Sequence, residues 1–280
     1  MNTSVDSRTK VYLSAGRRHG PVTRVFSPGD VGQMIKPFIF LDRFDIEGNG
    51  KPLFAMHPHS GIATMTVLTS GRMRYEDTTG KSGVLEPGSV EWMRAGAGVW
   101  HDGWPEPGER VQGWQLWFAL PAELESTPAE SQYLPPTAVR AIGPARVILG
   151  ALGGVTSEIR APQGIDVLHV RLSPGQRWSH VPRPEQEVAW AHVSHGEVRI
   201  DDVTVGEELA VFDAAVAKRP LQFEASSGKA AEFILGLAPR HPFDLVMGRY
   251  SVHTTPDALE LGQHEIARIG EHLRSQRRIA

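Results

Sequence analysis

Two short stretches decide the fold of this chain: residues 57–61 read HPHSG, and residues 98–106 read GVWHDGWPE. His57 and His59 are two residues apart, so in an extended strand both side chains project from the same face of the sheet. Residues 64–93 alternate short apolar runs with turns that contain glycine or proline, which is typical of antiparallel hairpins. Folded as a small antiparallel barrel, this segment can bring His101 against the first pair. We therefore take the three histidines as candidate metal ligands.

Composition limits the possible partners. The 280 residues suffice for one large or two ordinary domains, and 29 basic against 32 acidic residues give a net charge of -3. Because there is no long basic run, we expect no direct binding to nucleic acid. The chain has no cysteine, which excludes disulfides, thiolate chemistry and cysteine-ligated metals.

The N-terminal residues give an expectation for the location of the protein. Met1 to Lys10 is polar and has no apolar core of a signal peptide, and no apolar stretch of about 18 residues occurs in the chain. We therefore expect a cytoplasmic protein that does not associate with membranes.

The second half of the chain repeats the layout of the first. Residues 188–212 alternate as residues 67–93 do, with Gly196 where Gly71 stands. Such a repeat predicts an internal duplication, two barrels in one chain. A proline-punctuated stretch from 121 to 161 lies between the copies. We predict an N-terminal barrel with the metal site over residues 1–130, a linker or crossing segment over 131–160, and a C-terminal barrel ending in a helix over 161–280.

The second copy lacks the histidine pattern of the first. Only His180 falls near the expected pair, with Trp178 two residues before it, so we expect no second metal site. His169, His192 and His195 are interpreted as surface or hydrogen-bonded strand histidines.

The last residues predict a helix that packs on the barrels. Thr255 or Thr254 can cap its N-terminus, and Pro256 suits its first turn. Its apolar face is predicted to consist of Ala258, Leu259, Leu261, Ile266, Ile269 and Leu273.

Aromatic and methionine side chains supply the predicted barrel walls. We take them as ordinary core, although the same lining suits a flat apolar ligand. Asp42 and Asp45 are predicted to cap loops, because aspartate readily bonds nearby backbone. The polar residues expected on solvated strand faces are Arg72, Arg74, Glu91 and Arg94. The wall candidates are Met65, Val67, Met73, Trp92, Trp100, Trp104, Trp114 and Trp117.

Several further motifs carry a family resemblance. Residues 41–44 (LDRF), 86–93 (EPGSVEWM), 95–98 (AGAG) and 114–121 (WQLWFALP), together with the two histidine stretches, resemble the pirin family of cupin proteins. The resemblance covers most of the chain. It implies an all-β fold of two tandem cupin-type (jelly-roll) β-barrels, and the chain adds a C-terminal helix.

The resemblance also implies a ligand set, from which this sequence departs. In the pirin pattern three histidines and a glutamate hold the metal, with the glutamate two residues after the last histidine, where this chain has Gly103. Asp102 should face away from His101 by strand alternation, and Glu106 follows a proline in a predicted loop. A water or a substrate oxygen is an equally good fourth ligand. Imidazole suits iron, copper, nickel and zinc, and we expect a divalent ion, Fe(II) first, then Ni, Cu or Zn.

Two classes of function stay open. As an enzyme, the resemblance implies oxygen-dependent cleavage of a flavonol such as quercetin, with a small aromatic substrate and a metal held by His57, His59 and His101. The expected metal-bound glutamate would be the base, and Gly103 cannot serve. As a binding module, the resemblance implies a metal-dependent co-regulator whose partner is a transcription factor or a metabolic enzyme. We expect a monomer.

Overall fold

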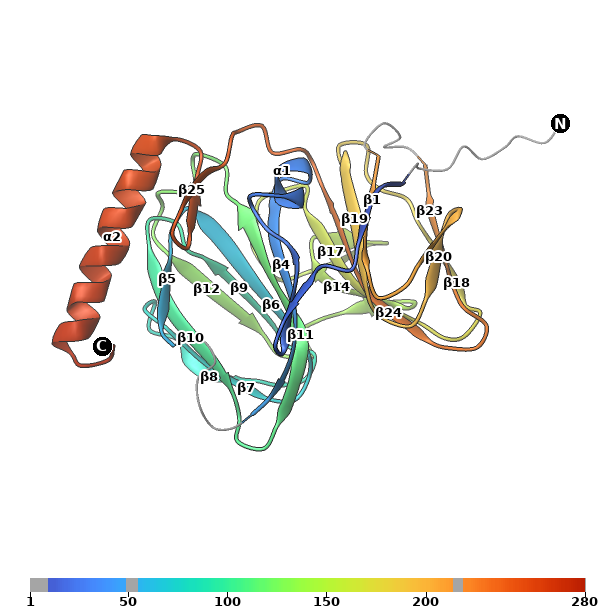
Figure 1. The fold of residues 1–280 in the computed structure, drawn as a ribbon, viewed down its shortest axis with the longest axis horizontal. Helices are drawn as coiled ribbons and strands as arrows, with labels where there is room; N and C mark the ends of the chain where they lie inside the picture. The colour runs from blue at the N-terminus through green and yellow to red at the C-terminus, as the bar shows by residue number, and fades with distance from the viewer. Residues whose placement is uncertain (1–9, 49–54, 214–218, 280) are drawn as a thin grey trace. The chain divides into compact units, whose positions relative to one another are not determined.

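The computed structural model describes residues 10–48, 55–213 and 219–279 (Figure 1). Most of Met1 to Lys10 lies outside these ranges. The chain divides into two compact units. We call the unit of residues 18–139 and 241–280 the first barrel, and the unit of residues 1–17 and 140–240 the second barrel. Within the described ranges, no helix is both long and apolar enough to cross a membrane.

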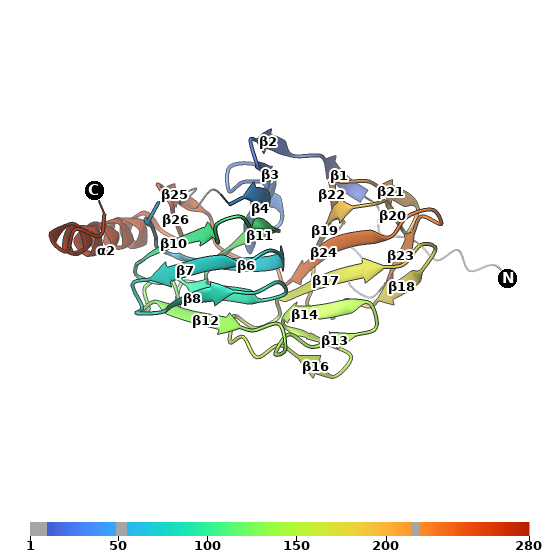
Figure 2. The ribbon, with the colours of Figure 1, turned by 90° about the horizontal axis from the view of Figure 1, so that it is seen from below.

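The first barrel consists of two large antiparallel sheets and a two-stranded hairpin in its C-terminal part. Its seven-stranded sheet has the order β12-β9-β6-β11-β4-β3-β2, and its four-stranded sheet has the order β5-β10-β7-β8 (Figures 1 and 2). The elements are β2 (Arg17–His19), β3 (Val22–Phe26), α1 (Val31–Met34), β4 (Phe38–Glu47), β5 (His57–His59), β6 (Ile62–Ser70), β7 (Met73–Asp77), β8 (Ser82–Leu85), β9 (Val90–Arg94), β10 (Val99–Pro105), β11 (Arg110–Ala119), β12 (Glu130–Leu134), β25 (Val246–Gly248), β26 (Ser251–His253) and α2 (Pro256–Ser275).

The second barrel repeats this arrangement strand for strand. Its two large sheets have the orders β1-β22-β19-β24-β17-β14-β13 and β18-β23-β20-β21, and β15 and β16 form a separate two-stranded sheet. The predicted two-barrel, all-β fold is therefore confirmed. The elements are β1 (Lys10–Ser14), β13 (Ala141–Ile142), β14 (Ala145–Leu149), β15 (Ala151–Leu152), β16 (Val155–Thr156), β17 (Asp166–Leu172), β18 (Arg177–His180), β19 (Val188–His195), β20 (Val198–Ile200), β21 (Val203–Val205), β22 (Leu209–Phe212), β23 (Leu221–Ala225) and β24 (Ala231–Ala238).

Equivalent turns explain how the repeat is encoded. Gly71 follows β6 and Gly196 follows β19, and both have φ in the left-handed region, +72° and +78°. At Gly71 a Cβ would lie 2.4 Å from the carbonyl oxygen of Arg110, and at Gly196 it would lie 2.3 Å from that of Ala230. Glycine at both hairpins is thus required by backbone conformation and by space.

The compact units differ from the three segments predicted from the sequence. Strand β1 belongs to the second barrel, because it extends that barrel's sheet by pairing with β22. Residues 131–160, predicted as a crossing segment, contain β13 to β16 and most of β12. Residues 241–280 belong to the first barrel, where α2 packs against β5, β10, β25 and β26. Hydrogen-bond pairing between distant strands sets these boundaries, and local composition does not reveal it.

The C-terminal helix forms as predicted at its start. Thr255 is the N-cap and its side chain accepts a hydrogen bond from the Ala258 amide at 3.2 Å, with Pro256 in the first turn. Ala258, Leu259 and Ile269 of the predicted face are half-buried. The fully buried face agrees with the prediction at Ile266 and Leu273 and differs from it at Leu261. It runs through Gly262, Ile266, Gly270 and Leu273, whereas Leu261 is 67% exposed. Gly262 and Gly270 let the helix approach the barrel more closely than larger side chains would.

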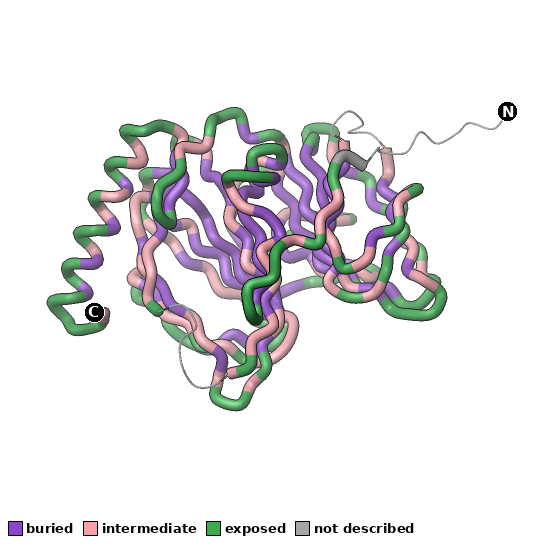
Figure 3. The backbone as a smooth tube through the Cα atoms, viewed as in Figure 1, coloured by how far each residue is buried: buried purple, intermediate pink, exposed green. Residues whose placement is uncertain are grey.

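Burial is continuous along the central strands of the barrels (Figure 3): β6 is buried from Ile62 to Leu68 and β19 from Val188 to Val193, whereas β20 alternates. Trp92 and Trp114, two of the predicted wall residues, are fully buried in the core. Asp42 and Asp45 were expected to cap loops, and this prediction is wrong. Both lie within β4, where Asp42 pairs with Arg24 and Asp45 pairs with Arg110, so cross-strand ion pairs take the place of loop contacts.

Candidate metal centre

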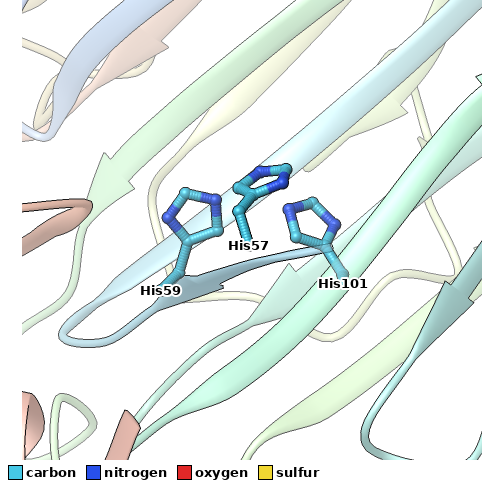
Figure 4. Close-up of side chains that lie close together, drawn as sticks. All are labelled: His57, His59 and His101. Carbon is cyan, nitrogen blue, oxygen red and sulfur yellow. The ribbon is translucent and has the colours of Figure 1, made fainter. Parts of the chain in front are cut away.

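The three predicted histidines lie together on the four-stranded sheet of the first barrel. Strand β10 pairs antiparallel with β5, which sets His101 directly opposite His57 and Val99 opposite His59. One ring nitrogen from each of the three lies within 4.8 Å of the others. The ring centroids are 4.5 Å apart for His57 and His101, 5.0 Å for His57 and His59, and 5.1 Å for His59 and His101. Figure 4 shows the three rings converging on a common space.

Hydrogen bonds to the main chain set the tautomers of two of these rings. The Nδ1 atom of His57 donates to the Ala55 carbonyl, and that of His59 donates to the Tyr250 carbonyl, each at 2.9 Å. A carbonyl can only accept, so Nδ1 carries the proton in both rings and Nε2 keeps its lone pair. The Nε2 atom of His101 is buried and has no hydrogen-bond partner in the part of the chain that the structure describes. Together these features fit nitrogen ligands for a divalent ion.

Burial keeps the cluster uncharged. Desolvation is the main cause that lowers the pKa of His59 to about 3, and the neighbouring His57 is the second cause. Desolvation also lowers the pKa of His57, and together with the other two rings it lowers that of His101 well below its ordinary value. Neutral imidazole is the form that binds a metal, so the cluster does not have to lose protons near neutral pH before it can bind one.

The carboxylate expected beside the histidines is absent at its usual place. Gly103 follows His101 by two residues on β10, and a Cβ there would meet nothing closer than 3.6 Å. Asp102 instead accepts a hydrogen bond from the Gly103 amide at 2.7 Å, and Glu106 pairs with Arg74 at 2.9 Å. Neither carboxylate is one of the converging ligand groups found among the described residues.

One buried carboxyl group near the cluster was missed by sequence reasoning. Glu91 was expected on a solvated face, and this prediction is wrong: the residue is 4% exposed, and its Oε1 lies 3.9 Å from Nδ1 of His101. Its Oε2 lies 2.5 Å from the Thr66 hydroxyl, and the Tyr133 hydroxyl lies 3.3 Å from Oε1. Desolvation raises the pKa of Glu91 to about 7. Its apolar neighbours were the available signal: Val90 and Trp92 lie on one face of the strand and Met93 lies on the face of Glu91, which indicates a strand buried on both faces.

A cavity of about 950 Å³ opens beside the cluster. Phe40 stacks on Trp117 with 4.2 Å between centroids, and Trp117 meets His59 edge-on at 4.9 Å. The polar side chains in its wall include Thr66, Glu91 and Gln115. Of the predicted wall residues, Met73, Trp100 and Trp117 line the cavity. The lining residues do not include Met65, Val67, Trp92, Trp104 or Trp114.

Two facing sheets that carry a histidine pair on one strand and a third histidine on its neighbour define a cupin barrel. The pirin family model matches residues 20–118. A pirin-like protein of Caulobacter vibrioides is 36% identical over 189 residues, which are 64% of this chain and 68% of that protein. The chain therefore belongs to the pirin family.

Solved structures share the fold. A quercetin 2,3-dioxygenase from Acinetobacter baumannii matches with a TM-score of 0.81 at 23% identity, covering 94% of this chain and 97% of that one. The bacterial pirin YhhW of Escherichia coli, solved in complex with nickel(II), matches with a TM-score of 0.64 at 21% identity, covering 84% and 96%. At these identities the likeness concerns the fold alone.

Proposed function

We propose that the protein is a metal-dependent dioxygenase of the quercetin type, acting on a small aromatic substrate. One observation carries the proposal: three neutral histidines direct ring nitrogens to one point in the wall of a cavity of about 950 Å³. Drug-sized ligands occupy cavities of about 300–1,000 Å³. A site that only stabilised the fold would be closed by protein ligands, whereas this one opens on a cavity.

His57, His59 and His101 would hold the ion through Nε2. Fe(II) is the first candidate, and nickel, copper and zinc also suit imidazole ligands; nickel(II) is the metal in the YhhW complex. When bound, the ion supplies Lewis acidity and open positions for substrate oxygen and dioxygen. The carbonyls of Ala55 and Tyr250 hold two of the rings in the ligating tautomer.

The remaining residues of the cavity would bind and orient the substrate. The stacked pair of Phe40 and Trp117 offers a flat apolar surface for an aromatic ring, and it excludes water. Glu91 is the carboxyl group in the cavity wall that lies 3.9 Å from a ring of the cluster. We assign to it the hydrogen bond from a substrate hydroxyl that a glutamate at position 103 would otherwise accept.

The test combines metal analysis with oxygen uptake. Protein loaded anaerobically with Fe(II) or Ni(II) is mixed with quercetin, and dioxygen consumption is followed beside the flavonol absorbance. We expect oxygen uptake that matches flavonol loss, no turnover in His59→Ala, and at least tenfold slower turnover in Glu91→Leu with metal content retained. Loaded wild-type protein that neither takes up dioxygen nor changes the flavonol spectrum contradicts the proposed enzyme.

Gly103 favours a second candidate function, a metal-dependent binding or regulatory protein. Without an anionic ligand the site keeps three neutral nitrogens, which leaves the full charge on a bound ion and lacks the usual base. If the loaded protein binds quercetin without consuming dioxygen, this second function is the one to pursue.

A further inference from the structure

The C-terminal segment contributes a main-chain group to the histidine cluster. The Tyr250 carbonyl accepts the Nδ1 proton of His59 at 2.9 Å, and the two residues are 191 apart in the sequence. Tyr250 also brings its ring within 6.0 Å of the His57 ring and 6.2 Å of the His59 ring, measured between centroids. A distant segment therefore determines which nitrogen of His59 carries the lone pair.

The backbone at this point is in an uncommon conformation. Tyr250 has φ +63°, in the left-handed region that residues other than glycine and asparagine rarely adopt. It stands in the two-residue turn between β25 and β26, where Gly248 pairs with Ser251. Such strain persists when the surroundings hold it, and it is found where function needs a particular geometry.

Helix α2 and the strand of His59 hold this turn from both sides. Gln263 on the helix donates to the Ser251 hydroxyl at 3.1 Å, and the Ser60 hydroxyl donates to the same oxygen at 2.9 Å. Ser60 directly follows His59 and also forms a β-bridge with Ser251. The turn is therefore fixed between the helix and the residue next to the ligand.

The helix makes a second contact beside the third histidine. Trp100 directly precedes His101, and its indole nitrogen donates to the Ile266 carbonyl on α2 at 2.8 Å. A side chain at Gly270 would not fit at this contact, because its Cβ would lie 2.7 Å from the Trp100 ring. At Gly262 a Cβ would lie 2.5 Å from Nε2 of His253. The helix can dock only with glycine at both places.

We infer that the turn at Tyr250 and helix α2 act as a positioning element for His59 and His101, so that docking of the helix and binding of the metal are thermodynamically linked. The inference rests on the proposed function in one respect, that the cluster binds a metal. Linkage is reciprocal: a docked helix strengthens metal binding by the same factor by which the metal favours the docked helix.

A buried polar group of Ser60, His253 and Glu125 lies under the helix. Its contacts support a positioning role for the helix rather than a second catalytic site. The Ser60 hydroxyl lies 3.0 Å from Nε2 of His253, and Nδ1 of His253 lies 3.4 Å from Glu125, an arrangement like that of a hydrolase triad. Ser60 is 0% exposed, so no substrate can reach it. Both oxygens of Glu125 accept from Thr254, at 2.7 Å each, directly before the helix. The group serves to anchor the helix start to the ligand strand.

A matched pair of substitutions at position 250 isolates the backbone effect. Tyr250→Asn and Tyr250→Val both remove the ring, but asparagine tolerates the left-handed region and a β-branched residue does not. We expect Ni(II), titrated by calorimetry, to bind the valine variant about tenfold more weakly than the asparagine variant, a typical effect of an outer-sphere change. Long-range ¹H–¹⁵N spectra of the metal-free proteins should show the Nδ1–H tautomer of His59 in the asparagine variant and a mixture in the valine variant. Equal affinities and equal tautomers in the two variants overturn the inference.

The linkage to the helix is tested at Gly262, with Leu261→Ala as the control on the exposed face. Gly262→Ala should weaken Ni(II) binding about tenfold, as disturbed outer-sphere groups do, and speed amide exchange along α2, whereas Leu261→Ala should change neither. Ni(II) should in turn slow α2 exchange in the wild type. If the wild type binds Ni(II) and Gly262→Ala binds it equally, the inference fails and the proposed function stands. If the wild type binds no divalent metal, both fail together.

Discussion

The two barrels have the same strand order, but their four-stranded sheets carry different side chains at equivalent places. In the first barrel β5 and β10 set His57 opposite His101. In the second barrel the equivalent pair, β18 and β23, sets Trp178 opposite Phe223. Phe223 in turn stacks on Phe233, with 5.0 Å between centroids, and lies 5.2 Å from Trp178. One barrel thus gathers polar ligands at this place, and the other packs aromatic rings.

The difference shows that fold and chemistry are specified by separate sets of residues. Strand pairing needs alternation and turn glycines, and both copies keep these, as Gly71 and Gly196 show. Chemistry needs a few inward side chains on one strand pair, and these can change without altering the sheet order. A barrel that loses its ligands must fill the space, because unfilled core volume is destabilising. The aromatic cluster around Phe223 does so in the second barrel.

The strongest test of this comparison removes ligands from one barrel and the equivalent histidine from the other. In His57→Ala/His101→Ala, we expect metal retention to be abolished, because one nitrogen ligand remains. His180→Ala alters the histidine on β18 of the second barrel and should leave the metal content of the folded protein unchanged. Elemental analysis of protein purified without chelator and then loaded with Ni(II) gives the result. Equal metal content in the double variant and the wild type contradicts the assignment of the site.

The next test compares the roles of one aromatic residue in each barrel. Phe223 is 1% exposed in the second barrel, so Phe223→Ala should lower the free energy of unfolding by about 3–5 kcal/mol. Trp117 lines the cavity of the first barrel and is only partly buried, so Trp117→Ala should cost less stability and weaken quercetin binding instead. Calorimetric unfolding and fluorescence titration measure the two effects. A ligand effect in Phe223→Ala, or none in Trp117→Ala, breaks the proposed division of roles.

Much of this division could be predicted from the sequence. The spacing of His57 and His59 on a strand, the hairpin glycines and the Thr255 cap are local signals, and the structure agrees with them. The clustering of His101 with the pair required only an antiparallel barrel. Short-range periodicity is informative where the neighbours of a residue in space are set by strand pairing within one hairpin.

The features that were missed depend on contacts between distant segments. The carbonyl of Tyr250 leaves no signature in the sequence, because any residue has a carbonyl. Glu91 has the sequence pattern of a solvated strand residue, but its strand, β9, is buried on both faces. On the neighbouring strand β6 it lies opposite Thr66. The membership of α2 in the first barrel follows from Gly262 and Gly270, two residues that a search for an apolar face passes over.

The pH dependence of stability should report on the buried histidines of the first barrel. Burial lowers the pKa of His59 to about 3 and lowers the pKa values of His57 and His101, while the unfolded chain titrates these groups near 6.5. Below pH 6.5 the unfolded chain therefore binds more protons, and stability falls as the pH falls. Glu91 has the opposite sign: its pKa is raised to about 7, so its contribution falls as the pH rises from about 4.5 to 7.

We expect the metal-free protein to lose stability from pH 6.5 down to 5. In His57→Ala/His101→Ala the slope should be shallower by up to about 2.7 kcal/mol per pH unit. The reason is that the variant lacks two groups that take up protons in the unfolded chain but not in the folded one. Denaturant unfolding at several pH values measures the slopes. Parallel curves for the two proteins would show that the buried histidines titrate alike in both states.

The smallest expected effect concerns the ligand that the first barrel itself lacks. Gly103→Glu places a carboxylate two residues after His101, on the same face of β10, where a Cβ would meet only ordinary contacts at 3.6 Å and beyond. The added anionic ligand should tighten Ni(II) binding about tenfold, or about 1.4 kcal/mol. Gly103→Gln has the same size without the charge, so the difference between the two variants isolates the carboxylate. Equal affinities would mean that the fourth position is not reached from residue 103. The first barrel would then bind metal with its three histidines alone.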